Sequence, residues 1–369
     1  MWGLGGQTGK QWGRLGWPPS GLQGAPKRFL ILGTPMPYPK MMPAAFLDPY
    51  SGRIMVFGGM SIYPQEIMLW LTPTPPGAWE VGPSSAWVNG ANNTRVMSKA
   101  FCQLSDGRVF GFTIGPDGSY AQIFNPVTNS WFTCAPHPVP DVLGKCVANL
   151  PSGRILVWGG TSDQPYIYDP AANTWTPTQG KFKLWSGFGM AWTPPGAMDN
   201  MTGDVLISGS AQFYKYIESA DRFTLQDSHP YGRASAELTP MVGSILDANE
   251  TPNFGYNYAG RLIVWNGLTE NVMRSTDNKY AVDAQVTGCQ LADGRVVMMG
   301  FSEVPYEGWA PSPNIYIWSP DSIAGPSPML KAKKIKTHVK IIQDYDGGVW
   351  FIGGNDNPNA TNAVEYWKP

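Results

Sequence analysis

The residues best suited to metal or nucleophile chemistry are few and lie far apart in this chain. The three histidines, His137, His229 and His338, fall in different regions without ligand spacing, and isolated histidines of this kind are usually structural. The cysteines form no C-x-x-C pair, so we expect free thiols in a reducing compartment at Cys102, Cys134, Cys146 and Cys289. The sequence therefore predicts no metal, no cofactor and no catalytic residue.

Three short segments offer other binding chemistry. A basic run interleaved with apolar residues indicates an exposed strand with its apolar side inward, although it could also face an acidic partner: Lys331, Lys333, Lys334, Lys336 and Lys340. Asn355-Asp356-Asn357 is one oxygen-rich turn, which is weak evidence for a cation site. Gly9-Lys10 lacks the preceding strand and the hydroxyl residue of a phosphate-binding loop.

One pattern recurs along most of the chain and predicts where its turns and strands lie. A small or acidic residue precedes glycine, arginine usually follows, and four or five apolar residues come next. The copies are centred on Gly52, Gly107, Gly153, Gly203, Gly260, Gly294 and Gly347. Glycine accepts the positive φ of a hairpin turn, and a short apolar run suits a strand covered on both faces.

Each repeat is therefore interpreted as a set of four strands in an all-β fold. The third and fourth strands are clearest at Ile167-Tyr168-Asp169-Pro170 and Trp175. The arginine after each turn is expected to be structural and to pair with turn carboxylates or carbonyls. These arginines are Arg53, Arg108, Arg154, Arg261 and Arg295.

The segment SGRILVWGGTSDQPYIYDPAANTWTP (Ser152–Pro177) resembles a nearly complete kelch repeat, with the glycine pair, the tyrosine and the tryptophan in the family order. The mean spacing of the seven glycines, about 49 residues, matches the kelch period of about 50. The resemblance covers roughly residues 39–369 and implies a seven-bladed kelch-like β-propeller closed by an N-terminal strand. The expected blades lie near residues 40–81, 95–134, 144–178, 186–226, 236–277, 284–320 and 336–369 plus strand 28–32.

Two details of this blade assignment are open to test. The close spacing of Gly260 and Gly294 predicts a short or missing outer strand in the fifth blade. Kelch propellers also include copper oxidases that resemble galactose oxidase, whose site needs two histidines, a tyrosine and a tyrosine crosslinked to cysteine. Cys102 and Cys289 stand six residues before the arginine of their blade, which indicates packing. We therefore expect the propeller architecture without its copper site.

Aromatic residues gather in insertions between the repeated strands. Such residues could stack on sugars or anchor a protein, with simple loop packing as the alternative. The candidate partner-binding residues there are Trp185, Trp192, Tyr256, Tyr306 and Trp309. Residues 1–27 form a Gly-rich segment that we expect to be an extended arm that orders on docking, and it adds Trp2, Trp12, Arg14 and Trp17 to the candidates.

Charge and composition narrow the function classes. A net charge of −1 gives no field toward nucleic acid, no apolar run approaches the roughly 20 residues of a membrane span, and no signal peptide is evident. Since WGRLGW (Trp12–Trp17) resembles phage structural proteins, we predict a non-enzymatic structural or interaction subunit of a large assembly such as a phage virion. This subunit would dock through the arm and the propeller rim, in a tail nozzle or tail tip.

Two alternatives stay open. One is a soluble, cytoplasmic kelch module that binds a protein partner or a carbohydrate such as a cell-surface glycan. The other is a propeller enzyme with a site in the central channel, which would require convergent carboxylates or histidines.

Overall fold

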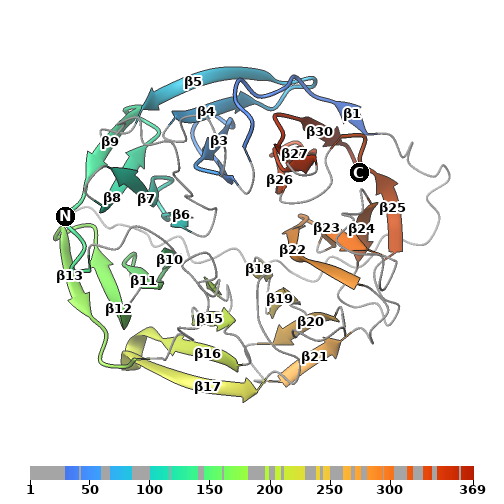
Figure 1. Cartoon of the computed structure of the whole chain (residues 1–369). Helices are drawn as coiled ribbons and strands as arrows, with labels where there is room; N and C mark the ends of the chain where they lie inside the picture. Colours follow the sequence, from blue (N-terminus) through green and yellow to red (C-terminus); the bar gives the residue numbers. More distant parts are fainter. Residues whose placement is uncertain are drawn as a thin grey trace, which may run out of the picture.

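The computed structural model shows an all-β chain. It describes residues 30–40, 43–59, 67–84, 100–115, 118–139, 145–159, 162–181, 196–198, 204–208, 212–228, 238–241, 244–249, 261–266, 271–275, 281–293, 295–302, 314–318, 327–334, 339–356 and 359–369. Within these residues, seven four-stranded antiparallel sheets and one two-stranded sheet form. The seven sheets lie around a common axis, with the chain running once around the ring (Figure 1).

The first three sheets follow one another in chain order. Sheet 1 comprises β2 (Ala44–Leu47), β3 (Ile54–Phe57), β4 (Ile67–Thr72) and β5 (Ala78–Ser84). Sheet 2 comprises β6 (Phe101–Gln103), β7 (Val109–Gly115), β8 (Gly118–Asn125) and β9 (Ser130–Thr133). Sheet 3 comprises β10 (Lys145–Asn149), β11 (Ile155–Gly159), β12 (Ser162–Asp169) and β13 (Thr174–Pro177).

Sheets 4, 5 and 6 repeat the same order of strands. Sheet 4 comprises β14 (Gly196–Met198), β15 (Val205–Ser208), β16 (Gln212–Ile217) and β17 (Arg222–Ser228), with the 3₁₀ turn η2 (Glu218–Ala220) before β17. Sheet 5 comprises β18 (Leu238–Met241), β19 (Ser244–Asn249), β20 (Arg261–Asn266) and β21 (Asn271–Ser275). Sheet 6 comprises β22 (Ala281–Gln290), β23 (Val296–Ser302), β24 (Asn314–Trp318) and β25 (Ser327–Lys331).

Sheet 7 joins the two ends of the chain. It contains β26 (Lys340–Gln343), β27 (Val349–Ile352), β30 (Val364–Trp367) and, as its outermost strand, β1 (Ile31–Leu32). Ile31 pairs with Tyr366 and Leu32 with Glu365, which agrees with the role expected for the N-terminal strand. The short strands β28 (Asn355–Asp356) and β29 (Asn359–Ala360) pair with each other beside this sheet.

Burial explains why the apolar runs occupy the second strand of each sheet. Every residue of β3, β11 and β27 is buried, because these strands lie between neighbouring sheets. The outermost strands β9 and β13 are instead mostly exposed and run along the circumference (Figure 1). The continuous apolar runs therefore mark the packed layer between sheets, and the polar runs mark the rim.

Sheet 5 corrects the strand assignment made from sequence. The run after Gly260 was expected to be the second strand, yet β20 is the third strand of its sheet, and β18 and β19 precede it. The pattern of glycine, arginine and apolar residues describes a turn and a strand but not the strand's place in a sheet. The fourth strand is present as β21, with five residues. In sheet 6 the fourth strand, β25, lies beyond the boundary expected at residue 320.

Tryptophan side chains tie neighbouring sheets together at the rim. The indole Nε1 of Trp79 donates to the carbonyl of Thr34 at 2.7 Å, that of Trp131 to Pro83 at 3.0 Å, and that of Trp175 to Ala135 at 2.8 Å. Each bond runs from an outer strand to the end of the preceding sheet's outer strand. The Trp79 bond joins β5 of sheet 1 to the segment that follows β1 of sheet 7.

The two ends of the ring axis differ in their connections. In five described turns from first to second strand, the backbone N–H before the turn donates to the carbonyl after it at 2.7–2.8 Å: Asp48 to Arg53, Leu104 to Arg108, Leu150 to Arg154, Leu291 to Arg295 and Asp344 to Gly348. We call this the turn end. We call the opposite end of the axis the loop end. There the first strand of each sheet begins and the second strand ends.

Among the described residues, no helix is long and apolar enough to cross a membrane.

Candidate functional site

The nine residues predicted from sequence to bind partners lie outside the described residues. They are Trp2, Trp12, Arg14, Trp17, Trp185, Trp192, Tyr256, Tyr306 and Trp309. The strands around five of them are described. The connections that hold these five lead into β14, or leave β19 and β23, and all three join the loop end of the ring. The topology thus gathers the ends of three aromatic-rich connections at one end of the axis.

Two buried lysines lie at the loop end. Lys40 is 1% exposed, and its ammonium group donates to the carbonyl of Gly58 at 2.8 Å, where β3 ends. Lys145 is 5% exposed at the start of β10, and its ammonium group lies 3.3 Å from the carbonyl of Gly159, the last residue of β11. Sequence reasoning missed both residues. The signal was a lysine at the entry to an apolar inner strand, where a charge is costly unless it is held by polar groups.

His137 is the one histidine within the described residues, and it is built into an aromatic cluster. Its ring centroid lies 4.6 Å from that of Trp175, 5.1 Å from that of Tyr166 and 5.8 Å from that of Phe112. Its Nδ1 lies 2.8 Å from the carbonyl of Val139. These contacts fix the ring between sheets 2 and 3, which is the structural role expected for an isolated histidine. His229 and His338 lie outside the described residues.

The cysteines are free thiols, and three of them are buried. Burial raises the pKa of Cys134 to about 11, partly offset by a hydrogen bond with Tyr168 and by the charge of Arg108. Burial also raises the pKa of Cys102 and of Tyr168 well above their ordinary values. All three groups are therefore protonated at neutral pH, and neither thiol is an activated nucleophile.

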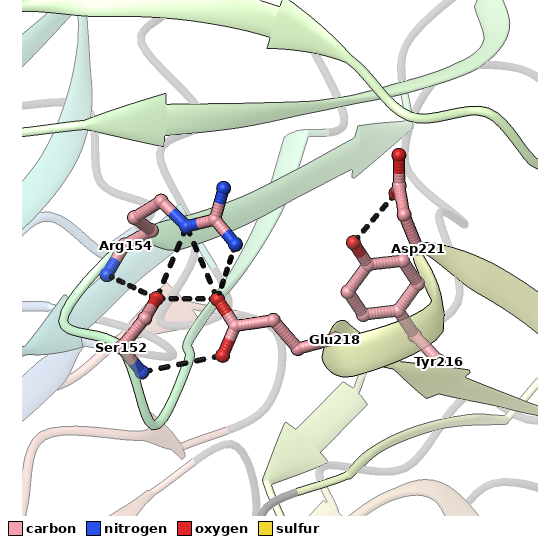
Figure 2. A network of polar contacts seen from close by, with 5 residues as sticks. All are labelled: Ser152, Arg154, Tyr216, Glu218 and Asp221. Atoms are coloured by element: carbon pink, nitrogen blue, oxygen red, sulfur yellow. Dashed lines mark hydrogen bonds and ion pairs between the residues drawn. The ribbon is translucent and has the colours of Figure 1, made fainter.

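A polar network joins sheets 3 and 4 through Ser152, Arg154 and Glu218 (Figure 2). Glu218 accepts from Arg154 Nη2 at 2.8 Å and from the Ser152 backbone N–H at 3.2 Å, and the Ser152 hydroxyl also donates to it. Three other turn arginines pair within their own sheet, Arg108 with Asp106 at 2.7 Å, Arg295 with Asp293 at 2.6 Å and Arg53 with Glu80 at 2.9 Å. The structural role predicted for these arginines is confirmed at the turns that are described.

The neighbouring part of Figure 2 shows a repeated contact. The Tyr216 hydroxyl donates to Asp221 at 2.8 Å, and the Tyr168 hydroxyl donates to Asn173 at 2.7 Å. Asp221 and Asn173 both have positive φ, and each also accepts a backbone N–H from the preceding sheet. Because the contact recurs in two sheets, it stabilises the ring and does not mark an active site.

Comparison with known proteins bears on the fold. No family model and no curated protein matches the chain. Among solved structures, the chain is similar to a "Novel fungal alcohol oxidase with catalytic diversity among the AA5 family, in complex with copper". The match has a TM-score of 0.64 and 16% identity, and covers 92% of this chain and 76% of that one. The chain has a galactose-oxidase-like all-β fold.

This galactose-oxidase-like chain does not show a copper site in its described residues. Copper oxidation of the kind that the resemblance implies needs two histidines and a tyrosine linked to cysteine. No group of three or more His, Cys, Asp or Glu side chains within the described ranges could hold a metal ion, and His137 is engaged in the aromatic cluster. The donor set of the copper group is therefore not found among the described residues, and His229 and His338 lie outside them.

The comparison corrects the functional prediction made from sequence. A non-enzymatic phage virion subunit was predicted, whereas the similar structure is an enzyme, and nothing in the comparison supports a phage, virion or tail protein. The error came from treating the absence of a recognisable catalytic motif as evidence against catalysis. Enzyme sites in folds of this kind draw single residues from many separate loops, and such residues have no spacing in the sequence.

Proposed function

We propose that this chain is a seven-bladed, kelch-like β-propeller, closed by its N-terminal strand, that binds a hydroxyl-bearing small molecule at its loop end. The ligand class is an alcohol or a carbohydrate. The seven sheets are the proposed blades, and the kelch-like repeat in sheet 3 supports this description.

The observation that carries the proposal is the convergence of aromatic-rich connections. Trp185 and Trp192 precede β14, Tyr256 follows β19, and Tyr306 and Trp309 follow β23. All three connections join the same end of the ring. Aromatic faces bind the apolar faces of sugars and alcohols, and loops on one end of a rigid ring are the usual place for such residues.

Buried ammonium groups at the same end hold the strand ends from which the loops start. Lys40 and Lys145 place ammonium groups near the ends of β3 and β11. The similar solved structure acts on alcohols according to its name, which favours the same class of ligand here.

A second candidate is oxidation of that ligand. The observation that favours it is the copper-containing alcohol oxidase with the similar fold. Because the described residues do not supply a copper site, we derive no catalytic step for this candidate.

The test is a calorimetric titration of the full chain with benzyl alcohol, glycerol, galactose and glucose in turn. The proposal expects at least one ligand to bind. Trp309→Ala and Trp192→Ala should weaken this binding by about tenfold, the size expected from losing one aromatic contact. Val127→Ala is the matched control, because Val127 is 65% exposed on a turn between β8 and β9 and should leave binding unchanged. Absence of binding, or binding that neither tryptophan variant changes, would refute the proposal.

Oxygen consumption by the same samples, with and without one equivalent of Cu²⁺, tests the second candidate. Consumption that needs both copper and alcohol supports it, and consumption that is identical without the alcohol contradicts it.

A further inference from the structure

Two turns at the turn end differ from the others in how they are held. The turn after β2 begins with Asp48, which is 2% exposed and accepts the backbone N–H groups of Tyr50 and Ser51 at 3.1 and 3.3 Å. The turn after β26 begins with Asp344, which is 6% exposed and accepts the Gly348 N–H and the Trp350 indole N–H, both at 2.7 Å. The corresponding turns of sheets 2, 3 and 6 begin with leucine, at Leu104, Leu150 and Leu291.

Each of these two turns carries an exposed tyrosine. Tyr50 is 63% exposed and Tyr345 is 64% exposed. Both belong to turns whose backbone is fixed by a buried aspartate. A tyrosine side chain held on a rigid turn loses little conformational freedom when it binds a ligand, so its aromatic ring is preorganised for binding.

The two tyrosines lie on neighbouring turns. Tyr345 Cδ2 comes within 3.6 Å of the position a Cβ would take on Gly52, in the turn of sheet 1. Tyr50 leans over Gly107 in the turn of sheet 2, with its Cε2 at 3.2 Å from the equivalent position, and its hydroxyl donates to the Asp106 carbonyl at 2.9 Å. The two rings thus cover the turns of sheets 1 and 2, with a glycine beneath each ring.

The fold does not require these tyrosines. The position of Tyr345 is occupied by Ser105, Pro151 and Ala292 in the turns of sheets 2, 3 and 6. Tyr50 lies in a turn that has one residue more than those turns. In sheet 3 nothing within 4 Å covers Gly153, the glycine that corresponds to the two covered ones. A large exposed side chain that the repeat does not need is a candidate for binding.

We propose that Tyr50 and Tyr345 form a carbohydrate-binding platform at the turn end, on which two sugar rings of an oligosaccharide stack. Pyranose rings have apolar faces that pack on aromatic rings, and their hydroxyl groups bind carboxylates. The exposed side chains of Asp106 and Asp346 border the two tyrosines; Asp346 supplies such an acceptor, and the Asp106 carboxylate is shared with Arg108. This site lies at the opposite end of the axis from the ligand site proposed above, and it does not depend on that proposal.

The size of the platform favours an oligosaccharide over a protein partner. A stable protein interface buries about 800 Å² on each side. Among the exposed large apolar residues that the structure describes, Tyr50 and Tyr345 are the two on the turns from first to second strand, and the others lie on outer strands or on the turn after β8. Two rings bordered by carboxylates match two sugar units, whereas a protein partner would need a broader apolar surface.

The test is calorimetric titration of the full chain with hexasaccharides of β-1,4-glucose, α-1,4-glucose, β-1,4-N-acetylglucosamine and β-1,4-xylose. We expect at least one to bind, and Tyr345→Ala and Tyr50→Ala each to weaken it about tenfold. Tyr50→Phe keeps the ring and should bind nearly as the original does. Phe132→Ala is the matched control, because Phe132 is 51% exposed on the outer strand β9.

The results separate this site from the one at the loop end. If no hexasaccharide binds, or if both tyrosine variants bind as the original chain does, the platform is refuted. The Tyr345 side chain is 64% exposed, so Tyr345→Ala should fold even if Tyr50→Ala does not, and circular dichroism checks both. Binding that is lost only in Trp309→Ala would place the sugar at the loop end, which refutes the platform and supports the proposed function.

Discussion

At the scale of single residues, buried groups that titrate decide how the ring responds to pH. The Cys134 thiol has a pKa of about 11 in the folded chain, mainly because burial disfavours the thiolate. In the unfolded chain a cysteine titrates near pH 8.5. Between these two values the folded chain holds a proton that the unfolded chain has lost. The stability contributed by this group is therefore complete below pH 8.5 and is lost as pH rises toward 11.

Replacing Cys134 tests this directly. The free energy of unfolding of the original chain should fall between pH 8.5 and 11, and Cys134→Ala should flatten part of this fall, by up to about 1 kcal/mol for each pH unit. Urea unfolding at half-unit pH steps measures the effect. Cys289→Ala is the control, since Cys289 is only partly buried. Equal pH slopes for the original chain and Cys134→Ala would show that the thiol is not held protonated by the fold.

At the scale of elements, turns and strands were predictable from sequence, but their order within a sheet was less so. Glycine, usually followed by arginine, and an apolar run correctly marked β3, β7, β11, β23 and β27 as the second strands of their sheets. The same pattern at Arg261 marked the third strand of sheet 5, because local sequence does not record how many strands precede it. The rim contacts of Trp79, Trp131 and Trp175 were not predictable either, since each indole donates to a carbonyl of another sheet.

The N-terminal strand offers a test at this scale. A chain that begins at Gly33 lacks β1 and also Leu30, which is 4% exposed in the apolar cluster of sheets 6 and 7. Loss of β1 and Leu30 should lower the free energy of unfolding by about 2–3 kcal/mol and leave the edge of β30 unpaired. A chain that begins at Arg28 keeps the strand and serves as the control. Equal thermal midpoints for the two chains would show that β1 does not stabilise sheet 7.

At the scale of the whole molecule, the sequence predicted a ring-like repeat fold but not what the ring does. The repeat is carried by turns and buried strands, so composition and spacing revealed it. The candidate sites are carried by residues that the repeat leaves free to vary, such as Tyr345 and the aromatic residues before β14. In a ring of this kind the packed sheets provide stability, whereas the turns and loops that the sheets hold can bind ligands.

Hydrogen exchange tests the central claim most directly, which is that a small hydroxyl-bearing ligand binds at the loop end. The full chain would be measured with and without the tightest ligand from the alcohol and monosaccharide panel. We predict slower exchange on ligand binding at the start of β14 and at the ends of β19, β23, β3 and β11, with no change in the turns 104–108 and 344–348. Slower exchange confined to those turns, or to the outer strands β9 and β13, would contradict a ligand site at the loop end.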